Sequence, residues 1–97
     1  MHGTLLILDE VICGVGRTGA YFVFERDHVV PDLVTISKGL GGGYTLIAAM
    51  LVGKRMADVL RQGTSAFNHS YIYQAHPVLC IAALAVQRVF RREKLVD

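Results

Sequence analysis

The chain has 97 residues, of which 53% are hydrophobic and 19% are charged, and its formal net charge is +2. So small a charge gives no argument for nucleic acid or an anionic membrane as a partner. Two cysteines without paired spacing predict neither a disulfide framework nor a zinc site, and they fit a reducing compartment. No charged-then-apolar stretch opens the sequence, so we expect no signal peptide, and the longest apolar run, residues 78–86, is too short to span a membrane. We therefore expect a cytoplasmic protein.

The first predicted element is a strand at residues 5–8, an unbroken apolar run that ends abruptly in Asp9 and Glu10. Such a run is typical of a strand that is buried on both faces. A glycine-rich stretch follows at residues 14–19, and an aromatic segment follows it at residues 21–24.

A turn at Pro31 precedes the second predicted strand, residues 33–37, which ends at Lys38. The residues between the first two strands suffice for a crossover connection, so these strands can be parallel. The next connection, residues 39–44, is too short for a crossover. A third strand at residues 47–52 should therefore be antiparallel to the second, which predicts an α/β fold with a mixed sheet.

Two helices are expected after the third strand, at residues 54–61 and 76–92. Pro77 suits the first turn of the second helix, and its predicted packing face is an apolar stripe made of Val78, Ile81, Ala82, Ala85, Val86 and Val89. No internal boundary is visible. The high apolar content is typical of the interior of a larger domain, so we expect residues 1–97 to be a fragment of one domain.

Asp9 and Lys38 are predicted at the carboxyl ends of two parallel strands, where ligands collect in open α/β sheets. Taken alone, Lys38 is a common solvated residue at a strand end, and Asp9 is as well suited to capping a turn. Together they match the requirements of pyridoxal 5′-phosphate. This cofactor needs a lysine amine for its aldehyde and a carboxylate for its pyridine nitrogen.

Three ordered blocks, residues 9–19, 31–44 and 67–77, resemble the core of class III aminotransferases, the ω-aminotransferase-like members of the fold type I pyridoxal-phosphate enzymes. The resemblance implies a fragment of the cofactor-binding large domain, with a partial mixed sheet. It also implies a transaminase that moves an amino group from an amine or ω-amino acid to a keto acid. The parent enzyme would be a homodimer or larger.

The resemblance implies a role for each matching residue. Lys38 would bind the cofactor covalently and then move a proton, while Asp9 would pair with the pyridine nitrogen. Val11 would pack on one face of the ring, and Glu10 would support the site. The glycines at 41–43 are interpreted as a tight turn after Lys38 rather than as a phosphate cradle.

Two residues depart from the family pattern. Ile72 stands where the family has a threonine that reaches the cofactor phosphate of the neighbouring subunit, so cofactor binding here would lack one hydroxyl contact. Leu46 stands where a proline is usual, which would loosen the turn. The family's phosphate loop, stacking aromatic residue and substrate-binding arginine have no counterpart in this sequence, so we expect the isolated chain to be inactive.

Two other interpretations stay open. The chain could be a truncated or degraded aminotransferase remnant without catalytic activity. More remotely, the glycine spacing from Gly14 to Gly19 matches that of a dinucleotide-binding fingerprint. However, it lies several residues beyond the strand, and no helix is predicted to start in it.

Overall fold

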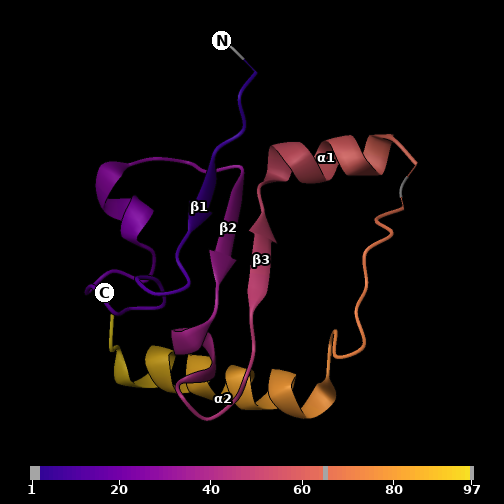
Figure 1. The fold of residues 1–97 in the computed structure, drawn as a ribbon. Helices are drawn as coiled ribbons and strands as arrows, with labels where there is room; N and C mark the ends of the chain where they lie inside the picture. The colour runs from indigo at the N-terminus through magenta and orange to yellow at the C-terminus, as the bar shows by residue number, and fades with distance from the viewer. Residues whose placement is uncertain (1–2, 65, 97) are drawn as a thin grey trace.

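The computed structural model describes residues 3–64 and 66–96. In this part of the chain a small sheet lies between two α-helices, one near each end of the strands (Figure 1). The elements in chain order are β1 (Ile7–Asp9), the 3₁₀ helix η1 (Val23–Asp27), β2 (Leu33–Ile36), the 3₁₀ helix η2 (Lys38–Gly41), β3 (Ala49–Val52), α1 (Lys54–Gln62) and α2 (Pro77–Glu93).

The sheet is mixed, as predicted, with the strand order β1-β2-β3. β1 and β2 are parallel, with Asp9 opposite Thr35, and β2 and β3 are antiparallel, with Thr35 opposite Met50. The loop that contains η1 carries the chain back to the start of β2, whereas η2 and a glycine turn reverse it directly into β3. Because β1 and β2 are parallel, their last residues, Asp9 and Ile36, lie at the same end of the strands, which we call the carboxyl edge of the sheet.

The prediction that the first strand is buried on both faces is wrong in this structure. β1 runs over Ile7–Asp9 instead of residues 5–8, and Ile7 is 61% exposed. The physical reason is position, because β1 is an edge strand whose one neighbour in the described sheet is β2. The second and third strands are also shorter than expected, at Leu33–Ile36 and Ala49–Val52.

The core lies on one face of β2. Val34 and Ile36 are buried there, and Val15 from the loop after β1 packs with them. Burial of one such side chain contributes about 1.5–3 kcal/mol. Partly buried apolar residues surround this cluster, namely Tyr21, Phe22, Phe24, Leu40, Ala49 and Phe90. The core thus joins the β1 loop, the turn after β2 and helix α2.

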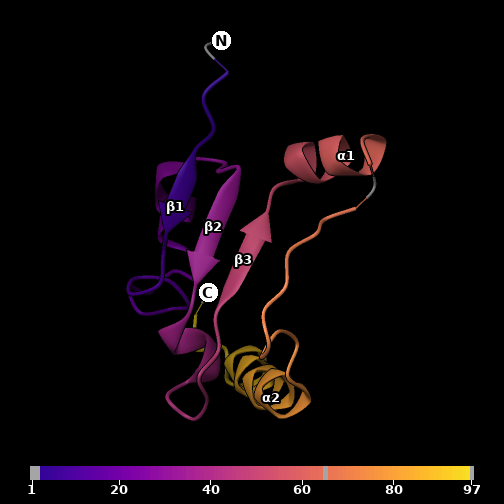
Figure 2. The same cartoon turned by 45° about the vertical axis from the view of Figure 1, so that its right-hand side comes forward.

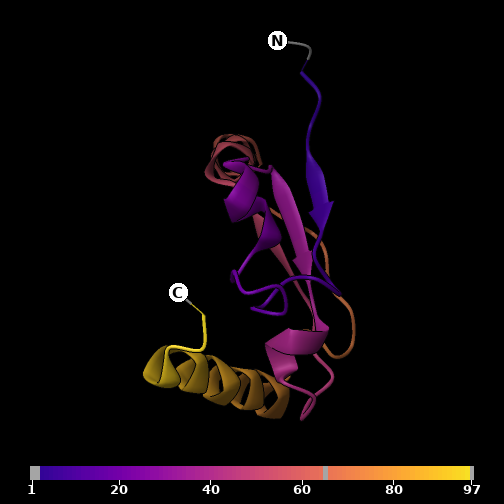
Figure 3. The same ribbon diagram turned by 90° about the vertical axis from the view of Figure 1, so that its left-hand side faces the viewer.

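Helix α2 crosses the molecule at the carboxyl edge of β1 and β2, next to η2 (Figures 1 and 2). A side view places most of α2 to one side of the strands (Figure 3). The packed face coincides with the predicted stripe only in part: Val86 packs against Gly42, but Ala83 from outside the stripe is buried, while Val78 and Ile81 are about two-thirds exposed. The helix is apolar around much of its circumference, so periodicity alone did not select the packed face. Within the described residues, no helix has the length and apolar character to cross a membrane.

Candidate functional site at the carboxyl edge of the sheet

Asp9 ends β1 at the carboxyl edge. Its Oδ1 accepts hydrogen bonds from the backbone N–H of Val11 at 3.0 Å and from the Thr35 hydroxyl at 3.4 Å. The first of these bonds is the turn-capping contact that the sequence allowed. The carboxylate is exposed, and its Oδ2 has no hydrogen-bond partner in the described part of the chain. One oxygen is thus fixed and the other is open to a ligand.

Lys38 is the first residue of η2 and is separated from the end of β2 by Ser37 alone. Its backbone is left-handed, with a φ of 38°, which costs of order 1–3 kcal/mol for a residue with a side chain. The residue is exposed, and no hydrogen bond or ion pair of its amine occurs among the described residues. The structure therefore places an exposed lysine amine, on a residue with a strained backbone, at the same edge of the sheet as Asp9.

One backbone and one side-chain hydrogen bond close the turn that carries Lys38. Leu40 N–H donates to the Ser37 carbonyl at 2.8 Å, and the Ser37 hydroxyl donates to the Ile47 carbonyl at 2.7 Å, across the base of the turn. Gly42 and Gly43 both have positive φ angles, 59° and 81°. The structure confirms the interpretation of residues 41–43 as a turn.

Glu10 holds the loop that follows β1. Its side chain is only 3% exposed, and its two oxygens accept hydrogen bonds from the backbone N–H groups of Val23 at 2.9 Å and Phe24 at 3.0 Å. Gly14 lies so close that a Cβ there would come within 2.8 Å of the Glu10 carbonyl oxygen. Glu10 therefore acts as an internal anchor for this loop.

The anchored loop reaches the Lys38 turn through Val15. This residue is buried and has a φ of 55°, an unusual backbone for a β-branched side chain. A Cβ on Gly39 would lie 3.0 Å from the Val15 Cβ, so the two residues are in close contact. The loop after the acid thus packs directly against the residue that follows the lysine.

Two surface hollows adjoin the carboxyl edge. One, of about 630 Å³, is lined by Lys38 and Gly39 together with Val15, Gly16 and Phe90, among others. The other, of about 370 Å³, is lined by Val11, Thr35 and residues of the segment after α1, including His69 and Tyr71. They share no lining residue, so the structure brings Asp9 and Lys38 to one edge but puts Val11 and Lys38 in separate hollows.

Ile72 is not gathered into this site. It is 94% exposed and lines neither of the two hollows. The stretch from Gly14 to Gly19 forms successive turns, and no helix begins in it. A dinucleotide fingerprint requires its glycines to open a helix, so the structure gives no support to that alternative.

The model of the aminotransferase class-III family matches residues 1–97. The chain belongs to this family. An aminotransferase of Gibberella zeae is 50% identical over 96 residues, and the match covers 99% of this chain but 19% of that protein. The acetylornithine aminotransferase of Nitrosomonas europaea is 43% identical over 96 residues, with coverage of 99% and 23%.

Solved structures of the family have the same fold. An (S)-enantioselective ω-transaminase from Thermomicrobium roseum has a TM-score of 0.86 at 40% identity, covering 95% of this chain and 21% of that one. A taurine:2-oxoglutarate aminotransferase from Bifidobacterium kashiwanohense, in complex with pyridoxal phosphate and glutamate, has a TM-score of 0.86 at 32% identity, with coverage of 95% and 20%. The chain thus spans about a fifth of the length of these family members.

Tyr21 and Gln87 were not selected by sequence reasoning, although they connect the parts of this site. The Tyr21 hydroxyl donates to Gln87 Oε1 at 2.6 Å, and Gln87 Nε2 donates to the Leu40 carbonyl at 3.3 Å. Partial burial raises the pKa of the Tyr21 phenol above its ordinary value, so this hydroxyl keeps its donor proton at neutral pH. The one signal for Gln87 in the sequence was the presence of a polar amide side chain in the middle of a largely apolar helix.

Proposed function

We propose that this chain is the part of a pyridoxal-phosphate-dependent transaminase, within its large domain, that supplies the cofactor's lysine and acid, Lys38 and Asp9. The observation that carries the proposal is the parallel pairing of β1 and β2, with Asp9 opposite Thr35 and Lys38 three residues further along the chain, just beyond the end of β2. Both side chains therefore leave the sheet at the same edge. Membership of the class III aminotransferases supports the same cofactor.

The side chains present fit the cofactor. Among the described residues the Lys38 amine has no partner, and Asp9 has one carboxylate oxygen free while the other is fixed by Val11 N–H and Thr35. A fixed carboxylate pairs well with a protonated ring nitrogen, and an unpaired exposed amine is available for an aldehyde. These are the complementary groups that pyridoxal phosphate requires.

When bound, the cofactor supplies an electron-withdrawing ring that acidifies the amine-bearing carbon of the substrate. Asp9 would keep the ring nitrogen protonated, because a nearby negative charge favours the charged form of a base. Lys38 Nζ would hold the cofactor covalently, and as a free amine it would accept the proton from the amine-bearing carbon of the substrate. Val11 would pack against the ring.

The proposed substrates are an amine or ω-amino acid as donor and a keto acid as acceptor. Relatives that are named as an ω-transaminase and as a taurine:2-oxoglutarate aminotransferase support this class. We further propose that the whole protein is a homodimer, in which Ile72 faces the neighbouring subunit. The near-complete exposure of Ile72 in its own chain is consistent with that position.

The proposal predicts that Lys38 is the lysine that binds the cofactor. The full chain is incubated with pyridoxal phosphate and reduced with borohydride, and the pyridoxyl label is mapped by mass spectrometry. We expect the label on Lys38, whose amine is unpaired in the part of the chain that the structure describes, rather than on Lys54, which forms an ion pair with Asp58, or on Lys94 at the end of α2.

A Lys38→Arg variant is the matched control, since it keeps the positive charge but cannot form the adduct, and it should lose this label. Labelling mainly on Lys54 or Lys94 would defeat the assignment. A folded chain that takes up no label at all would favour the alternative of an inactive remnant.

The Ile72→Thr substitution is expected to tighten binding of pyridoxal phosphate. A threonine hydroxyl can donate to the phosphate of the neighbouring subunit, and a hydrogen bond to a charged group contributes about 1.5–3 kcal/mol, roughly ten- to a hundredfold in affinity. Fluorescence titration of the dimer with the cofactor measures the change. Ile81→Thr is the control, because Ile81 is also exposed but lies on α2. Equal effects of both substitutions would contradict a phosphate contact at residue 72.

A further inference from the structure

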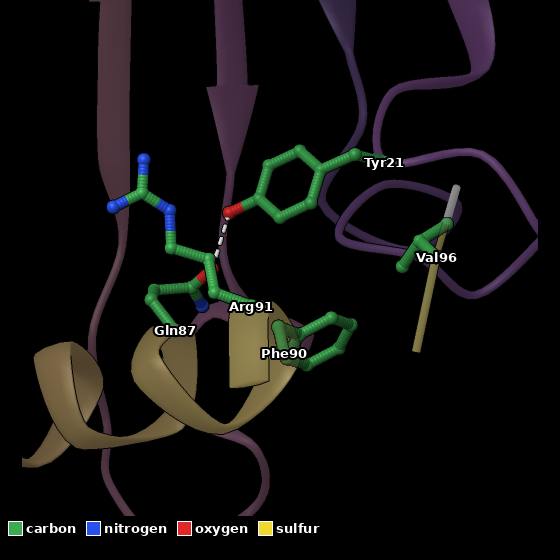
Figure 4. A pocket seen from close by; sticks show the side chains of 5 residues that line it. All are labelled: Tyr21, Gln87, Phe90, Arg91 and Val96. Atoms are coloured by element: carbon green, nitrogen blue, oxygen red, sulfur yellow. Dashed lines mark hydrogen bonds between the residues drawn. The ribbon is translucent and has the colours of Figure 1, made fainter. Parts of the chain in front are cut away.

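Gln87 lies on the packed face of α2, with both ends of its amide bonded. Its Oε1 accepts from the Tyr21 hydroxyl at 2.6 Å, and its Nε2 donates to the Leu40 carbonyl at 3.3 Å. Figure 4 shows Tyr21 reaching from its loop toward Gln87, beside Phe90 on the helix. Burial of a polar amide is costly unless its groups are hydrogen-bonded. The two bonds therefore explain why a polar residue is tolerated on this face.

The two partners of Gln87 belong to the two segments that carry the proposed cofactor residues. Tyr21 lies in the loop that begins at Asp9 and is anchored by Glu10. Leu40 lies in η2, two residues after Lys38. One side chain from a distant helix thus connects the loop after the acid to the turn that carries the lysine.

The turn at Lys38 needs external support. A left-handed backbone at a residue other than glycine persists only where its surroundings fix it. The Ser37 hydroxyl fixes the base of the turn through the Ile47 carbonyl. At Gly42, a Cβ would lie 3.0 Å from a Val86 methyl group, so α2 also packs closely on the far side of the turn. Among these contacts, the Gln87 bond to Leu40 is the side-chain hydrogen bond from α2 to the turn.

We propose that Gln87 is a positioning residue for Lys38: its amide bridges Tyr21 and Leu40 and so holds the η2 turn against the loop that follows Asp9. This inference rests on the proposed roles of Lys38 and Asp9. It adds a residue that contacts neither the cofactor nor the substrate and acts through the backbone of Leu40.

The first test uses the full chain without cofactor. Hydrogen–deuterium exchange is measured at the Leu40, Gly42 and Tyr44 amides, which are bonded within the turn. Gln87→Leu should speed their exchange about two- to tenfold, the effect of one lost hydrogen bond, and leave the β2–β3 amides unchanged. Arg88→Leu is the control, since Arg88 is the exposed neighbour on the same helix.

Two further variants separate hydrogen bonding from packing. Gln87→Glu keeps the shape and the acceptor for Tyr21, but it loses the donor to Leu40 and should match Gln87→Leu. Tyr21→Phe keeps the bond to Leu40 and should have a smaller effect. If Gln87→Glu behaved like the unmodified chain, or if exchange rose equally in the sheet and the turn, Gln87 would be a structural residue and the inference would fail.

The second test uses the protein loaded with pyridoxal phosphate. The pH midpoint of the visible absorbance of the bound cofactor depends on the surroundings of the lysine nitrogen. We expect this midpoint to shift in Gln87→Leu and Gln87→Glu and to stay unchanged in Arg88→Leu. An unchanged midpoint in both Gln87 variants would overturn the positioning role. If the unmodified chain binds no cofactor, the proposed function fails, while the exchange experiment still decides whether Gln87 holds the turn.

Discussion

In the whole protein to which this chain would belong, Lys38→Ala is expected to lower the rate of amino transfer by about 10²–10⁴-fold, the usual contribution of a positioned acid–base group. The variant removes the nitrogen that takes the proton from the substrate carbon, and no other lysine of the described residues lies in this turn. Stopped-flow measurement of the absorbance change on adding the amine donor follows this step directly. Alanine removes the side chain beyond Cβ, and the backbone hydrogen bonds donated by Leu40 and Gly42 in this turn stay in place.

Lys54→Ala is the matched control, because Lys54 is an exposed lysine on α1 whose ion pair with Asp58 is at the surface. Its rate should stay within about twofold of the unmodified protein, as expected for a surface substitution. Addition of a small amine such as methylamine should partly restore the rate of Lys38→Ala, since a free amine can replace the missing base. A Lys38→Ala protein with an unchanged rate would remove Lys38 from the chemistry.

Glu10→Leu is expected to lower the free energy of unfolding by about 3–6 kcal/mol. The carboxylate accepts two backbone hydrogen bonds, from Val23 and Phe24, and each bond to a charged group contributes about 1.5–3 kcal/mol. Leucine would leave both N–H groups without a partner beneath the loop. Urea unfolding of the full chain, followed by circular dichroism, measures the loss.

A graded series tests the cause of this loss. Glu10→Gln keeps one acceptor oxygen, so its effect should fall between those of Glu10→Leu and the control. The control is Glu25→Gln, because Glu25 is exposed and accepts a single bond from Phe22 N–H at 3.3 Å. Equal stabilities for Glu10→Leu and Glu25→Gln would show that the buried carboxylate does not anchor the loop.

The order and direction of the strands followed from the sequence, because connection length decides whether neighbouring strands can be parallel. The crossover between β1 and β2 was long enough, whereas the connection from Gly39 to Tyr44 was not, and the structure confirms both directions. The placement of Asp9 and Lys38 at one edge then follows from the parallel pair. This part of the site could be predicted because it depends only on the lengths of the connections and the directions of the strands.

The side-chain contacts could not be predicted from the sequence in the same way. Helix α2 is apolar on several sides, so the face that packs depends on which residues lie next to it. Gly42 is one of them, because its lack of a side chain lets Val86 approach closely. Gln87 is linked to Tyr21 across 66 positions of sequence, and no local pattern connects residues so far apart. The separation of Val11 and Lys38 into different hollows depends on where the segment with His69 lies, which periodicity does not determine.

The left-handed backbone at Lys38 has a consequence for how this position evolves. Glycine adopts a φ of 38° without steric cost, so selection for folding stability alone would place glycine here, as it does at Gly42 and Gly43 in the same turn. If the chain no longer carried out chemistry, this position would be among the first to drift toward glycine or asparagine, whereas the buried Glu10 would be retained as long as the protein must fold.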